Sequence, residues 1–185
     1  MAQGSESFGF VIDPTISPDV APLAWLVGTW EGEGELGYPG IEPSRFTQTV
    51  HIGHDGGPYL THASEIRLLD EDGPGQVWAS ESGYWRVPPQ EALQNIPKPG
   101  ETRQVEVEFL LAEPSGHVSV YMGVANGPRI DLATDLIART DSGAEVEAAT
   151  RLYGLVQGQL MWAHDMAAFG ESLQSYASAQ LQRKG

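Results

Sequence analysis

Histidine, tyrosine and tryptophan side chains are the groups of this chain that could bind a ligand. The five histidines are spread through the sequence, and no two of them have the spacing of a helical metal-binding pair. There is no cysteine, which excludes disulfides, thiolate metal sites and cysteine nucleophiles. The serine-hydrolase, phosphate-loop and dinucleotide-binding motifs are also missing. The sequence therefore disfavours a hydrolase or a nucleotide enzyme and predicts no metal site.

A glycine-rich motif around a tryptophan offers a first candidate site. Its residues alternate with a threonine and three glutamates, and this period of two predicts a strand over residues 29–36 with one acidic, wet face. The other face carries Gly28, Trp30, Gly32 and Gly34. Trp30 has two interpretations, as an ordinary core residue or as the floor of a cavity that the glycines keep open.

The end of the chain offers a second group of candidates. His164 has the same strand parity as Trp162, so it should point inward, either as a hydrogen-bonded core histidine or as a ligand contact. Tyr176 either closes the apolar stripe of a last helix or reaches a ligand with its phenol, which is a known haem ligand. The candidate ligand-contacting residues are Tyr176, His164, Trp162 and Leu173.

Most of the elements that must position these residues are short strands. Residues 1–16 are predicted to be a flexible lead to a domain over residues 17–185, and Ser17-Pro18-Asp19 starts a short helix that ends by Gly28. Turn signals such as Asp141-Ser142-Gly143 separate the strands that follow, which favours an antiparallel barrel or sandwich. The predicted strands are 29–36, 44–54, 59–69, 76–87, 103–112, 117–124, 129–139, 146–156 and 159–168.

Periodicity then predicts which side chains face inward and where the strands stop. Most strands have one apolar face, which indicates one interior, and over residues 117–124 that face is Val118, Val120, Met122 and Val124. The tail has helical spacing and predicts a C-terminal helix, with an apolar stripe of Leu173, Tyr176, Ala177, Gln180 and Leu181.

The composition limits partners and location. With 25 acidic and 10 basic residues the formal net charge is -15, which repels nucleic acid and anionic membranes and favours solubility. The N-terminus lacks the basic and apolar regions of a signal peptide, and no apolar run approaches the ~20 residues of a membrane helix. We expect a cytoplasmic protein with no nucleic-acid or membrane partner; its oligomeric state stays open.

The motif region resembles a known family. Residues 22–34 are similar to the start of a nitrobindin domain, with Gly28, Trp30, Gly32 and Gly34 matching its GxWxGxG signature. Residues 38–41, 81–87, 113–116 and 166–173 agree as well, and an insertion-like stretch lies near 88–102. The resemblance implies an all-β, antiparallel up-and-down barrel of about ten strands, distantly like lipocalins and fatty-acid-binding proteins. Typical members hold ferric haem through one histidine and are linked to nitric oxide binding and peroxynitrite isomerisation.

The chain departs from this family pattern at the haem ligand. The family histidine lies three residues after the leucine that matches Leu173, and that position is Tyr176 here. A phenol has a pKa of about 10 and must lose its proton to bind iron well. The leading hypothesis is therefore a barrel that holds a hydrophobic small molecule, with no cofactor and no isomerase activity. The alternatives are a haem b protein with altered ligation through Tyr176 or His164, acting on nitric oxide or peroxynitrite, and a filled barrel that serves only as a scaffold.

Overall fold

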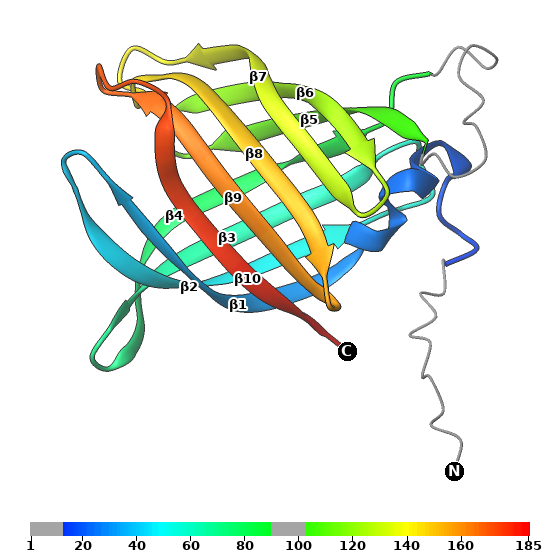
Figure 1. Cartoon of the computed structure of the whole chain (residues 1–185), viewed down its shortest axis with the longest axis horizontal. Coiled ribbons are helices and arrows are strands. Elements are labelled where there is room, and N and C mark those ends of the chain that lie inside the picture. The colour runs from blue at the N-terminus through cyan, green and yellow to red at the C-terminus, as the bar shows by residue number, and fades with distance from the viewer. Residues whose placement is uncertain (1–12, 90–102) are drawn as a thin grey trace.

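The computed structural model describes residues 13–89 and 103–185, which form one closed barrel (Figure 1). Ten antiparallel strands follow one another around the wall, and β10 closes the circle by pairing with both β9 and β1. The strands are β1 Gly28–Tyr38, β2 Ile41–Gly53, β3 Leu60–Asp70, β4 Gly73–Arg86, β5 Gln104–Glu113, β6 His117–Asn126, β7 Arg129–Arg139, β8 Val146–Val156, β9 Gln159–Ala168 and β10 Gln174–Lys184. This confirms the antiparallel barrel and its strand number.

The one helix among the described residues lies at one end of the barrel. It is the 3-10 helix η1, Pro18–Leu26, which begins after the Ser17 cap and places Leu23 and Leu26 against the barrel core. Trp30 secures it from inside the barrel by donating its indole N–H to the Leu26 carbonyl at 2.8 Å. The barrel therefore has an end covered by η1 and an opposite end formed by the β1–β2, β3–β4, β5–β6, β7–β8 and β9–β10 connections (Figure 1). We call this opposite end the mouth.

The predicted C-terminal helix is wrong, because residues 174–184 form the strand β10. The helical stripe is a coincidence of spacing: the residues that β10 buries are Ala177, Ala179 and Leu181, which follow a period of two. Two of these are alanines, so the strand pattern in the sequence is weak. The strand forms because without it β1 and β9 would each present an unpaired row of N–H and C=O groups.

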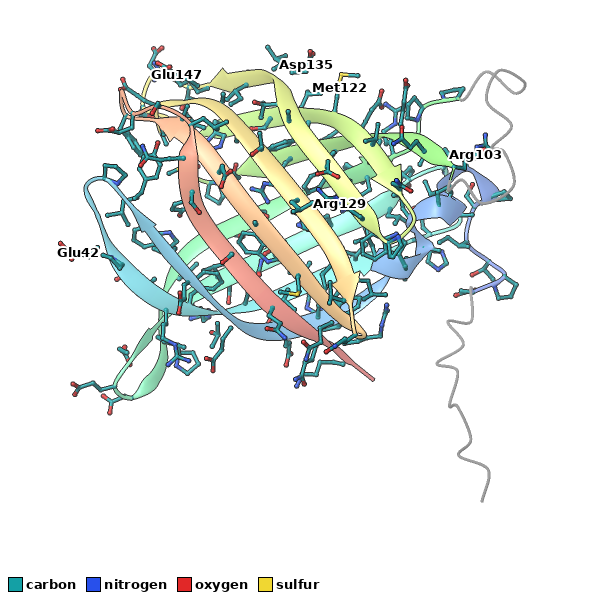
Figure 2. All side chains as sticks on the ribbon, in the orientation of Figure 1. Glu42, Arg103, Met122, Arg129, Asp135 and Glu147 are labelled. Carbon is teal, nitrogen blue, oxygen red and sulfur yellow. The ribbon has the colours of Figure 1, made fainter. Side chains whose placement is uncertain are left out.

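The inward face predicted for β6 is also wrong. Val118, Met122 and Val124 are exposed, whereas Ser119 and Tyr121 are buried in the interior. The same outward apolar surface continues onto β7, where Leu136 faces solvent. The pairing of β6 with β7 shifts register between Val120 and Tyr121 of β6. Met122 and Asp135 project from the outside of the wall in Figure 2. Apolar periodicity identified the wrong face because the interior near the mouth is partly polar.

Large rings fill much of the interior. In the part of the chain that the structure describes, five aromatic side chains are less than 2% exposed: Trp30, Trp85, Tyr121, Phe46 and Phe109. Trp85 on β4 stacks on Phe109 on β5, with ring centroids 3.8 Å apart and planes 8° apart. Such rings bury more apolar area than any other side chains and dominate the core energetically. Residues 1–12 and 90–102, which include most of the predicted lead and of the insertion-like stretch, lie outside the described residues.

Candidate functional site

The glycine motif lies at the seam between β1 and β10. A Cβ on Gly34 would meet the Phe46 ring and the Ser178 carbonyl oxygen, and a Cβ on Gly32 would meet the backbone of Gln180. The space beside Gly32 and Gly34 is therefore filled by β10 and by Phe46 and is not a cavity. The lack of side chains at these two positions lets β10 approach β1 closely. Trp30 is fully buried near the covered end, where the Arg183 guanidinium lies 4.1 Å from the centre of its ring. These positions make the motif part of the closed end and the seam.

The other predicted residues lie toward the mouth. Tyr176 lies close to the start of β10, at a β-bulge between Ser175 and Ala177 where the pairing with β9 shifts. A bulge redirects side chains, and here it places Tyr176 against the His164 ring, with centroids 5.4 Å apart. Tyr38 makes a second edge-to-face contact with Tyr176 at 6.2 Å. Leu173 precedes the strand with its side chain half exposed.

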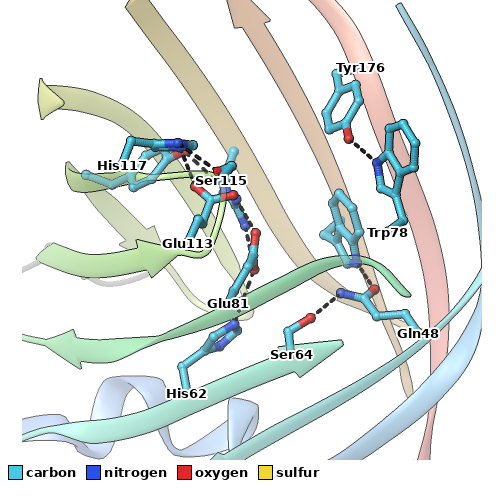
Figure 3. Close-up of polar contacts among 12 residues, drawn as sticks. Gln48, His62, Ser64, Trp78, Glu81, Glu113, Ser115, His117 and Tyr176 are labelled. Carbon is cyan, nitrogen blue, oxygen red and sulfur yellow. Dashed lines mark hydrogen bonds and ion pairs between the residues drawn. The ribbon is translucent and has the colours of Figure 1, made fainter. Parts of the chain in front are cut away.

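The Tyr176 hydroxyl already has a hydrogen-bond partner. It accepts the indole N–H of Trp78 at 2.7 Å, as Figure 3 shows. Burial raises the pKa of the Tyr176 phenol, so the group is neutral at physiological pH. Trp78 comes from β4 and was not among the residues predicted from the sequence. Trp78 has the same strand parity as the exposed residues Tyr84 and Arg86 of β4, so the sequence pattern did not indicate a role at the mouth.

His164 faces the interior as predicted, and one of its ring nitrogens has no hydrogen-bond partner there. Its side chain is only 9% exposed, and its Nε2 atom has no hydrogen-bond partner. Burial, followed by repulsion from the charge of Arg151, lowers the pKa of this imidazole to about 3. His164 is therefore a neutral imidazole at physiological pH, and one of its ring nitrogens is unused inside the barrel.

Two sets of hydrogen-bonded polar side chains connect strands inside the barrel, below the mouth. Gln48 on β2 accepts the Trp162 indole N–H at 2.7 Å and donates to the Ser64 hydroxyl at 2.9 Å (Figure 3). Trp162, the remaining predicted contact residue, is thus held in place by a hydrogen bond and by stacking on Phe46. A buried polar group must be satisfied in this way to avoid a large desolvation cost.

The second set is a buried ion pair between Arg151 and Glu81, which was not predicted from the sequence. The Arg151 guanidinium binds the Glu81 carboxylate through two hydrogen bonds of 2.5 and 3.1 Å and also donates to Tyr121 and Tyr153. Burial opposes ionisation of Glu81, but the charge of Arg151, the hydrogen bonds from Arg151 and the nearby His62 imidazole, whose Nε2 is 3.6 Å away, hold its pKa well below its usual range. Strand parity was the available signal, because Arg151 lies two residues before Tyr153 on β8 and therefore shares its inward face.

A groove on the outer wall is a separate feature. It has a volume of about 640 Å³, runs over β8, β9, β10 and β1, and is lined in part by Leu152, Met161 and Ser178. Tyr176 and His164 do not line it. Among the described residues no three His, Asp or Glu side chains are close enough together to hold a metal ion, and no described helix is long and apolar enough to cross a membrane.

Comparison with known proteins agrees with this architecture. A family model described as the THAP4-like, heme-binding beta-barrel domain matches residues 19–183. A ferric nitrobindin-like protein of Beutenbergia cavernae is 48% identical, over 94% of this chain and 98% of its own length. A peroxynitrite isomerase of Kocuria rhizophila is 38% identical, over 93% of this chain and 94% of its own.

The same relationship holds for a solved structure. The crystal structure of Rv2717c from M. tuberculosis superposes with a TM-score of 0.74 at 30% sequence identity, covering 92% of this chain and 99% of that one. The sequence matches span nearly the whole barrel rather than one motif, and the strand arrangement is shared. This chain belongs to the nitrobindin family of THAP4-like, haem-binding β-barrels.

Proposed function

We propose that this barrel binds an apolar small molecule at its mouth, and that it does not hold haem iron through residue 176. The observation that carries the proposal is the unpartnered Nε2 atom of His164, which is nine-tenths buried beside the aromatic ring of Tyr176. A buried nitrogen without a partner is costly, and a ligand group at the mouth would satisfy it. Apolar contact with the surrounding rings would supply most of the affinity.

Tyr176 does not fit the role of a haem ligand. A strong bond to ferric iron needs the phenolate, whereas burial raises the pKa of this phenol and its oxygen already accepts a hydrogen bond from Trp78. Arg151, which acts on Tyr176 electrostatically, is paired with Glu81. The hydrogen bond from Trp78 favours loss of the phenolic proton, but burial outweighs it and keeps the pKa of Tyr176 raised, so we expect no peroxynitrite isomerase activity through Tyr176.

The same nitrogen of His164 supports a second candidate function. A neutral imidazole with a free ring nitrogen is a good donor to haem iron, and His164 lies opposite Ala177, the residue after Tyr176. Haem would then be held from β9 instead of β10. This candidate predicts that ferric haem gives a saturable shift of its Soret band with the wild-type protein, and that His164→Ala abolishes the shift.

The main proposal is tested with an uncharged apolar fluorescent probe, N-phenyl-1-naphthylamine. We expect saturable binding at one site per chain and no saturable Soret shift with ferric haem. Ala177→Phe, which places a ring inside the mouth, should weaken probe binding at least tenfold. Ser178→Phe is the matched control, because Ser178 is exposed and lines the outer groove.

The outcome separates the interior from the outer wall. Both variants are first compared with the wild type by circular dichroism and thermal unfolding, so that a folding defect is not read as lost binding. Loss of binding with Ser178→Phe but not with Ala177→Phe would contradict the proposal and place the ligand in the outer groove. A Soret shift that survives in Tyr176→Phe but is lost in His164→Ala would replace it with the second candidate.

A further inference from the structure

The hydrogen bond between Trp78 and Tyr176 spans the mouth of the barrel. The shorter way around the wall from β10 to β4 passes β1, β2 and β3, so the two strands are four steps apart in a ring of ten. The Trp78 indole nevertheless donates to the Tyr176 hydroxyl at 2.7 Å, which is possible only if the ring reaches across the opening (Figure 3). Trp78 is 36% exposed, so it is neither a core residue nor fully in solvent.

The backbone that carries Trp78 is irregular. Opposite it on β3, the pairing register shifts on both sides of Arg67, so that Ala79 pairs with Ile66 and Val77 pairs with Arg67. Trp78 is the extra residue between these two pairs. On its other side, β4 pairs with β5 only from Ser82 onward. This bulge directs the indole toward the mouth, and few regular ladder contacts hold the segment there.

The walls around the indole suit a flat, uncharged molecule. Tyr176 is in edge-to-face contact with both Tyr38 and His164, and its hydroxyl offers a hydrogen-bond acceptor. The His164 imidazole is neutral, and the charge of Arg151 is balanced by Glu81. Glu113 also acts electrostatically on Tyr176, but its carboxylate is in contact with the His117 imidazole at 2.6 Å. An aromatic ring with one polar hydrogen would find both stacking partners and an acceptor at Tyr176.

We propose that the Trp78 indole is a built-in occupant of the ligand site, and that the natural ligand is a planar aromatic molecule with one N–H or O–H donor, such as an indole or a phenol. This inference rests on the proposed function and specifies its ligand class. Such a molecule replaces the indole with the same shape and the same hydrogen bond to Tyr176. Because Trp78 competes for the site, the wild-type affinity is reduced by the fraction of molecules in which Trp78 occupies it.

Isothermal titration calorimetry with indole and 1-methylindole tests this assignment. Trp78→Ala removes the competitor, so we expect it to bind indole at least tenfold more tightly than the wild type. On Trp78→Ala, 1-methylindole should bind at least fivefold more weakly than indole, because it has no N–H for Tyr176. Adding Tyr176→Phe should remove that preference. Tyr84→Ala is the matched control, since it removes an exposed aromatic side chain from the same strand and should bind like the wild type.

A second measurement keeps the test valid if Trp78→Ala does not fold. In wild-type protein labelled with 5-fluorotryptophan, saturating 4-methylphenol should move the Trp78 fluorine resonance toward its solvent-exposed position and leave that of the buried Trp85 unchanged. The Trp78 resonance is assigned with Trp78→Phe. A Trp78 resonance that does not move at saturation would overturn the inference.

Other outcomes are equally decisive. Equal indole affinity in Trp78→Ala and the wild type would show that Trp78 does not compete for the site. An unchanged preference for indole over 1-methylindole after Tyr176→Phe would show that Tyr176 is not the acceptor. If N-phenyl-1-naphthylamine binds at the mouth and indole does not, this inference fails while the proposed function stands. If neither probe binds the wild type or Trp78→Ala, both fail.

Discussion

Replacing Arg151 with methionine should strongly destabilise the barrel. The side chains of Arg151 and Glu81 are only 3% and 10% exposed, and the guanidinium makes two hydrogen bonds to Glu81 and one each to Tyr121 and Tyr153. Methionine fills similar space but leaves the Glu81 carboxylate buried without its cation. Breaking a buried pair in this way costs about 3–5 kcal/mol, which lowers the melting temperature of a chain of this size by roughly 6–20 °C.

Two further variants show whether the unpaired charge is the cause. The double variant Glu81→Leu/Arg151→Met removes both charges, so it should recover most of the lost stability. Arg129→Met breaks the exposed pair with Asp131 and should cost at most about 1 kcal/mol. The free energy of unfolding is measured by urea denaturation at pH 7. If Arg151→Met costs no more than Arg129→Met, or if the double variant is less stable than Arg151→Met, the reasoning is refuted.

Two smaller predictions concern His164 and Gly34. Since burial lowers the pKa of His164 to about 3, the unfolded chain takes up a proton first, and stability falls as the pH drops from about 6.5 toward 3. His164→Phe should therefore lose about 1 kcal/mol less than the wild type between pH 7 and pH 5.5 in urea denaturation; equal losses would argue against a buried neutral imidazole. Gly34→Ala should cost about 1–3 kcal/mol in thermal unfolding, because its methyl group meets Phe46 and Ser178. Gly154→Ala is the control, because a Cβ there would meet only the Pro128 carbonyl oxygen, at an ordinary contact distance of 3.8 Å, and equal effects would contradict the packing argument.

The sequence revealed the barrel more clearly than the site. Alternating residues and turn signals located nine strands, and the parity of His164 correctly indicated that it faces inward. The tenth strand was missed because Ala177 and Ala179 bury little apolar surface, so their period of two was weaker than the helical spacing of the larger residues. The inward face of β6 was reversed for a related reason, since its exterior is more apolar than its interior.

The role of Trp78 could not be read from the chain. Its contact with Tyr176 joins residues separated by 98 positions, and it depends on a bulge in β4, a bulge in β10 and closure of the whole wall. Neither the two bulges nor the closure of the wall can be recognised from the residues around Trp78 or Tyr176 in the sequence. The pairing of Glu81 with Arg151 is similar: strand parity could have placed each residue inside, but only the closed barrel brings them together across it.

By itself, the sequence determined the antiparallel strands, the acidic exterior of β1 and the absence of cysteine chemistry, because these follow from residue type and from periods of two along the chain. Tertiary structure alone decided that the space beside Gly32 and Gly34 is taken by β10 and Phe46, that the Trp78 indole reaches the Tyr176 hydroxyl, and that His164 keeps a nitrogen without a partner. The physical reason is closure: strands four places apart around the wall share one interior, and which side chains meet there depends on the register of every pair between them.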